Sequence, residues 1–266
     1  MEMKFEHQTF GRRLGTMLKV DFRRMFTQSL LYIMVGVALV IPVLVLVMTT
    51  LMDGSVSVDP TTGVETVMEG FDNAWHAIAK PSTESAMSMD MVGMCNINLL
   101  YFAVAVFVCI FVSDDFRSGY AKNLFTVRAK KADYVISKTL AGFVCGALMI
   151  LAWVIGTVLG GCIVSLPFDL GAAGVSGLVM CLLGKVFLIL LFVALSVLLA
   201  VAAKQKLWMS ITFSCMAGML FFMMIPMLTP LDSTIVNVIG CGLGGALFSV
   251  GLGAISNMVL KKTSLV

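Results

Sequence analysis

Few residues in this 266-residue chain have the type and spacing that chemistry requires. Its two histidines, His7 and His76, lie outside the long apolar runs, and no HExxH, GxSxG or Walker A sequence occurs. The seven cysteines are scattered singly with no CxxC pair, which argues against a zinc site or a disulfide framework. We therefore expect no enzyme: no catalytic residue, no metal ligand and no cofactor bound by this chain.

Three polar residues interrupt or adjoin apolar runs and are the candidate pathway residues: Asn96, Asn98 and Lys185. A lysine at the centre of a bilayer costs about 2.5–3.5 kcal/mol on insertion scales. Lys185 therefore either faces a substrate pathway or snorkels at the outer end of a span formed by residues 186–203 alone. Asn96 and Asn98 either line such a path or lie near the outer membrane boundary.

The segment from Ser113 to Lys138 combines charge with an apolar centre at Leu124 and Phe125. It is bounded on both sides by apolar runs. Such a segment has the composition of a surface that contacts another protein. Its charged residues are Asp114, Asp115, Arg117, Lys122, Arg128, Lys130, Lys131, Asp133 and Lys138.

The composition places these residues in a membrane protein. The chain is 59% hydrophobic and 12% charged, with a mean hydropathy of +1.01, whereas soluble domains carry roughly 25% charged residues. Runs of about 18 or more apolar residues are long enough to cross a bilayer. The first run is too long for a signal-peptide h-region and is interpreted as a span. The sequence predicts an all-α integral membrane fold with six transmembrane helices, at about 30–51, 91–112, 139–166, 178–203, 207–228 and 235–260, together forming a domain of residues 29–262.

The segments around the first span have different characters. Residues 1–28 alternate apolar and basic residues at near-helical spacing, which indicates an amphipathic helix on the inner membrane surface, with an ordinary cytoplasmic tail as the alternative. The outer loop 52–90 is acidic, with Lys80 as its one basic residue. In the third span, Gly142 with Gly146 and Gly156 with Gly160 form GxxxG pairs that predict close approach of neighbouring helices.

Orientation follows from the basic residues. If the first connection faces outward, 16 of the 18 lysines and arginines fall inside, leaving only Lys80 and Lys185. The positive-inside rule then places both termini and the segment 113–138 in the cytoplasm, with the chain in the cell membrane as a multi-pass protein. The basic residues are split among separate segments without a nucleic-acid motif, so the predicted partner is the lipid bilayer and not a nucleic acid.

The segment 113–138 resembles the corresponding loop of the membrane subunits of type-2 ATP-binding-cassette (ABC) exporters. In that family an acidic residue ends the second span and is followed by a glycine, a small helix, basic residues and a lysine that opens the third span. The matching residues here are Asp115, Gly119, Leu124, Lys130 and Lys138. Tyr120 stands where the family usually has threonine, and Val127 where proline is frequent.

The resemblance implies a function for the whole chain, an ABC transporter permease subunit that exports its substrate. A cytoplasmic coupling helix from Ser118 to Lys131 would dock into a separate ATP-binding cassette subunit, which would bind ATP and magnesium. Two copies of the permease, or two related permeases, would form the pathway. A cationic antimicrobial peptide, a drug or an ion is the expected substrate class. The expected docking residues are Asp115, Gly119, Tyr120, Leu124, Phe125, Arg128 and Lys130.

A second function fits the acidic loop 52–90. A membrane sensor or immunity protein would bind a cationic peptide electrostatically through this loop without transporting it. A stand-alone ATP-binding cassette encoded beside this chain would favour the exporter, and a neighbouring histidine kinase would favour the sensor.

Overall fold

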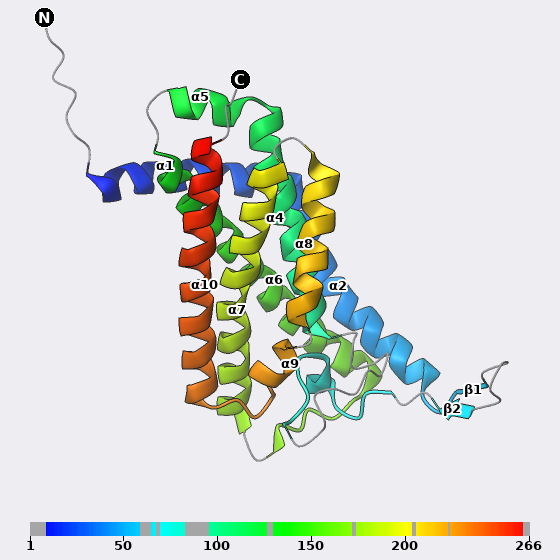
Figure 1. Cartoon of the computed structure of the whole chain (residues 1–266). Helices are drawn as coiled ribbons and strands as arrows, with labels where there is room; N and C mark the ends of the chain where they lie inside the picture. The colour runs from blue at the N-terminus through cyan, green and yellow to red at the C-terminus, as the bar shows by residue number, and fades with distance from the viewer. Residues whose placement is uncertain are drawn as a thin grey trace, which may run out of the picture.

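The computed structural model describes residues 9–58, 65–67, 70–82, 96–126, 130–171, 174–203, 206–222 and 224–262. These residues form a bundle of long helices with short helices and one small hairpin at its ends (Figure 1). The elements are α1 (Phe10–Thr27), α2 (Ser29–Met52), β1 (Val56–Val58), β2 (Glu65–Val67), η1 (Ala74–Ala77), η2 (Ile97–Leu99), α4 (Leu100–Arg117), α5 (Tyr120–Thr126), α6 (Lys131–Val164), α7 (Gly174–Ala203), α8 (Leu207–Phe222), α9 (Ile225–Leu228) and α10 (Ile235–Lys262).

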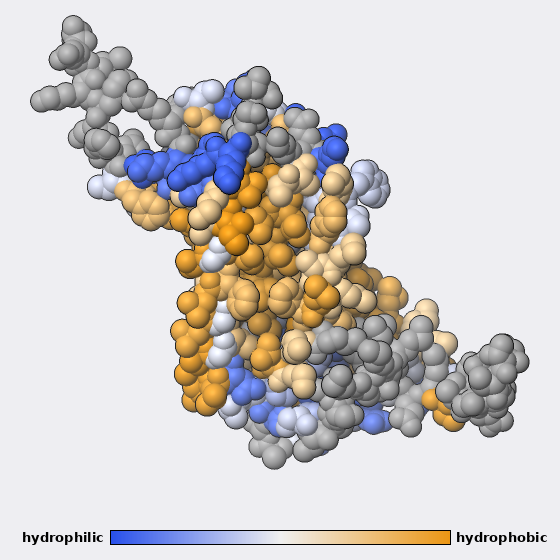
Figure 2. Space-filling model, in the orientation of Figure 1, coloured by the Kyte–Doolittle hydropathy of each residue, from blue (hydrophilic) through white to orange (hydrophobic). Residues whose placement is uncertain are grey.

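Five helices in the described part of the chain are long and apolar enough to cross a membrane: α2, η2 with α4, α6, α7 and α10. On the face that Figure 2 shows, apolar residues cover the middle of the bundle and hydrophilic residues gather at its two ends, as expected of a membrane-embedded protein. The apolar segment predicted at 207–228 is divided into α8, of 16 residues, and the short α9.

Two helix boundaries differ from the predicted spans 91–112 and 139–166. Helix α4 continues past Val112 to Arg117, and α6 begins at Lys131, eight residues before the predicted start. Hydropathy ends a span at the first charges, but Asp115, Asp133 and Lys138 are all buried within the bundle by ion pairs. Because these charges are paired, the helices that carry them can continue inside the protein.

The amphipathic segment near the N-terminus is a helix, as predicted. Helix α1 lies across one end of the bundle, near α5 and the C-terminal end of α10, while the β-hairpin and α9 lie at the opposite end (Figure 1). Met17, Asp21 and Met25 are the buried residues of α1. Their spacing of four residues places them on one face of the helix.

Glycines set the closest helix contacts, as the GxxxG pairs predict. A Cβ on Gly142 would lie 2.7 Å from a Val193 methyl group of α7, and one on Gly146 would lie 2.7 Å from Ile189. Gly156 and Gly160 face α2, where the backbone of Val43 would lie 3.0 Å from a Cβ on Gly160. Helix α6 therefore packs against α2 and α7 at distances that only glycine permits.

The described part of loop 52–90 is ordered by backbone hydrogen bonds. Ala74 N donates to Pro167 O at 3.1 Å, and Leu231 N donates to Lys80 O at 3.0 Å. The Trp153 indole of α6 donates to Ala77 O at 3.2 Å. Residues 70–82 thus cover the end of the bundle opposite α1 and connect α6 to the segment after α9.

Candidate functional site

Four charged side chains from α1, α4 and α6 meet inside the protein at the end that carries α5. Lys138 Nζ lies 2.8 Å from Asp21 Oδ1 and 2.7 Å from Asp115 Oδ2, and Arg24 lies 2.6 Å from Asp115 Oδ1. Asp21, Asp115 and Lys138 are at most 1% exposed. Two acids and two bases balance each other, so no net charge is left in this charge cluster, which we define as Asp21, Arg24, Asp115 and Lys138.

Hydroxyl groups of α6 complete the charge cluster. Ser137 donates to Asp21 Oδ2 at 2.6 Å, and Tyr134 donates to Asp115 Oδ2 at 3.0 Å. Ser137 and Lys138 follow Tyr134 by three and four residues, so both lie on the same side of α6 as Tyr134. Buried carboxylates are tolerated only when they are paired and hydrogen-bonded, and here both carboxylates receive several donors.

The Arg24 guanidinium of the charge cluster also reaches α5. Burial lowers the pKa of Arg24, but the charge and hydrogen bond of Asp115, together with the charges of Tyr120 and Asp21, leave that pKa raised. The guanidinium carbon lies 4.3 Å from the centre of the Tyr120 ring, a cation–π distance. Burial and the two nearby carboxylates raise the pKa of Tyr120, against the opposing effect of Arg24. Helix α1 is therefore held to both α4 and α5 by one side chain.

Helix α5 packs its apolar residues inward. Ala121 is 1% exposed, and Leu124 and Phe125 are half-buried against the hydrophobic core. The Phe125 ring makes an edge contact with Tyr134 at 5.4 Å between centroids. Gly119, with a φ of 72°, forms the turn between α4 and α5, and its positive φ favours glycine.

The residues that α5 turns toward solvent are polar. Lys122, Asn123 and Thr126 are exposed, as are Arg117 and Ser118 before the helix and Lys130 after it. A partner approaching this end of the bundle would first meet these polar side chains. Leu124 and Phe125 are only partly exposed to it, because they also pack against the hydrophobic core.

The structure divides the predicted docking residues into three groups. Asp115 is enclosed in the charge cluster, and Gly119, Tyr120, Leu124 and Phe125 shape or anchor α5. Lys130 is exposed at the start of α6, and Arg128 lies outside the described residues. Sequence analysis missed Asp21 and Arg24. The available signal was an acid placed between Met17 and Met25 on the apolar face of α1.

A second polar site surrounds Lys185. Its ammonium donates to Asn98 Oδ1 at 2.9 Å and to Thr229 Oγ1 at 3.0 Å, and the residue is 1% exposed. Tyr101 donates to the Lys185 backbone carbonyl at 2.9 Å, which links α4 to α7. Helix α7 begins at Gly174, so residues 186–203 are only part of this helix, and the Lys185 ammonium is held within the bundle by Asn98 and Thr229.

The predicted pathway residues do come together around Lys185. Asn96 Oδ1 accepts a hydrogen bond from Asn98 N at 3.0 Å and so fixes the turn that presents the Asn98 side chain. Thr229, after α9, was not predicted, because nothing in the sequence connects it to a lysine 44 residues earlier. At this site the lysine ammonium donates hydrogen bonds to two uncharged oxygen atoms, and its positive charge would repel a metal ion. The described residues contain no group of three or more His, Cys, Asp or Glu that could hold a metal ion.

Replacing Lys185 with methionine is expected to destabilise the chain by about 1–3 kcal/mol, because Asn98 Oδ1 and Thr229 Oγ1 would lose a buried donor. The measurement is the thermal unfolding midpoint in detergent, with K206M at an exposed lysine as the control. Adding N98L to K185M should restore part of the loss, since removing both partners costs less than leaving one unpaired. Additive effects of K185M and N98L would contradict the pairing.

No protein-family model, curated protein or solved structure matches the chain. Its function is therefore inferred from the geometry and chemistry of its own residues.

Proposed function

We propose that this chain is the membrane subunit of an ABC exporter, driven by a separate ATP-binding cassette subunit and working as a pair of permeases. The observation that carries the proposal is the attachment of α5. This short helix has an exposed polar face and contacts α4 and α6, the two helices that it connects. The charge cluster ties the same two helices to α1.

The proposed orientation places α1 and α5 in the cytoplasm. Exposed basic residues gather at this end of the bundle, among them Arg12, Lys19, Arg23, Lys122 and Lys262. The positive-inside rule favours this orientation. In the proposed topology α8 and α9 together make the fifth crossing. At about 1.5 Å per residue α8 alone has a length of about 24 Å, which leaves α9 to complete it.

A force applied to α5 has a continuous path to the opposite end of the bundle. Phe125 contacts Tyr134 near the start of α6, and α6 extends for 34 residues. About two-thirds of the way along α6, Trp153 donates a hydrogen bond to Ala77 O of the loop that covers the bundle. Rigid-body movement of packed helices is a known route for such coupling. We expect closure of the ATPase subunits to move α6 and so to alter the outer covering.

Charge reversal on the exposed face is expected to break the proposed docking. In K122E/K130E, the amount of a co-expressed ATP-binding cassette subunit that co-purifies should fall at least about tenfold, which corresponds to a loss of about 1.4 kcal/mol of binding free energy. Both side chains are exposed, so the elution volume and thermal midpoint of the permease alone should not change. The control is R23E, which changes an exposed charge on α1 instead.

Unchanged co-purification of K122E/K130E would contradict the docking proposal. These substitutions test it more directly than aspartates at Leu124 and Phe125. The latter would insert charge into the contact between α5 and Tyr134 and would disturb α5 itself.

A further inference from the structure

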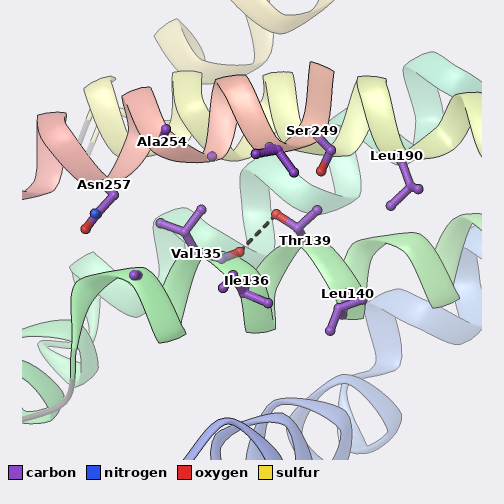
Figure 3. A pocket seen from close by; sticks show the side chains of 11 residues that line it. Val135, Ile136, Thr139, Leu140, Leu190, Ser249, Ala254 and Asn257 are labelled. Atoms are coloured by element: carbon purple, nitrogen blue, oxygen red, sulfur yellow. Dashed lines mark hydrogen bonds between the residues drawn. The ribbon is translucent and has the colours of Figure 1, made fainter. Parts of the chain in front are cut away.

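A groove lies between α6 and α10, on the part of both helices nearest α1. It has a volume of about 410 Å³, within the roughly 300–1,000 Å³ range of small-molecule sites. Val135, Thr139 and Leu140 of α6 and Ser249 and Ala254 of α10 line the groove (Figure 3). Gly253 of α10 and Leu190 of α7 also line it.

The groove is apolar and is open along its rim. Val135 is 3% exposed at its base, whereas Ile136 is 38% and Val250 is 74% exposed at its edges. The Thr139 hydroxyl is already satisfied, because it donates to Val135 O at 2.9 Å. Both helices are long and apolar enough to span a membrane. An apolar chain could therefore enter sideways from the hydrocarbon layer without crossing water.

One end of the groove is polar and basic. Asn257 lines that end (Figure 3), and its buried Oδ1 has no hydrogen-bond partner in the described part of the chain. Lys261 follows Asn257 by four residues, so it continues the same face of α10 beyond the groove. Lys261 and Lys262 are both exposed. Lys131 lies beside them, with its Nζ 2.6 Å from Leu260 O.

We propose that this groove binds an anionic phospholipid from the leaflet nearest α1. One acyl chain lies between Val135 and Gly253, and the headgroup phosphate lies against Lys261 with Asn257 beside it. The pattern of an apolar slot that ends at lysines complements an anionic lipid, and an uncharged apolar molecule would make no use of the basic end. The site requires no ATPase subunit, so it stands apart from the proposed function.

The groove offers a matched pair of filling variants. A Cβ on Gly253 would lie 3.8 Å from a Val135 methyl group, so a leucine there would occupy the groove. Gly251 lies on the same helix with no other atom within 4 Å of such a Cβ, which makes G251L the control. A254L is a second filling variant, at an exposed position that lines the groove.

The test is native mass spectrometry of the purified full chain titrated with phosphatidylglycerol or phosphatidylcholine that carry the same acyl chains. We expect the chain to bind phosphatidylglycerol more tightly than phosphatidylcholine. The G251L variant should retain this binding, and the G253L and A254L variants should lose it. K261Q should lower the affinity for phosphatidylglycerol by about fivefold, because it removes roughly one charge contact of the kind that lysines make at a membrane surface. K122Q, at an exposed lysine on α5, should leave it unchanged.

Three results would overturn the proposal. Equal retention of phosphatidylglycerol by the filling variants and G251L would show that the lipid binds elsewhere. Equal affinity for the two lipids, unaffected by K261Q, would show that the site does not recognise an anionic headgroup. Loss of self-association in G253L with lipid binding intact would assign the groove to a second copy of this chain.

Discussion

Replacing Lys138 with methionine is expected to destabilise the folded chain by about 3–5 kcal/mol, the cost of removing one partner from a buried ion pair. Lys138 Nζ is the cation that both Asp21 and Asp115 share, at 2.8 and 2.7 Å. Without it, two buried carboxylates would face the single positive charge of Arg24. The thermal midpoint in detergent should fall by roughly 10 °C, since 1 kcal/mol shifts the midpoint of a chain of this size by about 2–4 °C.

The double variant D21N/K138M separates charge balance from loss of packing. It leaves the Arg24–Asp115 pair, at 2.6 Å, and restores neutrality. We expect it to recover a large part of the stability lost in K138M, because replacing a whole buried pair is often nearly neutral. K122M, at an exposed lysine, should change the free energy of unfolding by less than about 0.5 kcal/mol. A K138M midpoint equal to that of K122M would contradict the role of the charge cluster.

The long apolar helices and the amphipathic α1 could be predicted because hydropathy and helical spacing are properties of neighbouring residues. The GxxxG pairs were equally informative, since Gly142, Gly146, Gly156 and Gly160 all meet another helix closely. The ends of α4 and α6 were not predictable in the same way. In the sequence, a charged residue such as Asp115 indicates the end of a span unless its ion-pair partner is known. That partner, Arg24, lies 91 residues away.

In the candidate sites too, the sequence predicted individual residues but not their contacts. Asn98 and Lys185 could be selected singly as polar residues near or within apolar runs, but their hydrogen bond spans 87 residues. Leu124 and Phe125 could be identified as an apolar centre in a charged segment. Whether they face a partner or their own bundle depends on Tyr134, which only tertiary packing places beneath α5. Residue type therefore predicted which positions matter, and packing determined what they contact.

Replacing Gly156 with leucine is expected to cost at least about 3 kcal/mol, at or above the upper end for overpacking in a close-packed region. Any Cβ at this position would collide with the carbonyl oxygen of Leu39 and would lie 2.6 Å from Pro42 Cγ. The Leu39 carbonyl belongs to the backbone of α2, so a side-chain rotation cannot relieve the collision. The whole of α2 would have to move away from α6.

G244L in α10 is the matched control, because a Cβ on Gly244 would meet no other atom within 4 Å. Both substitutions replace a helical glycine with leucine, so the change in helix propensity is the same and the difference in thermal midpoint isolates packing. We expect G156L to unfold roughly 6–12 °C below G244L. Equal midpoints would mean that α2 is not held against α6 at Gly156.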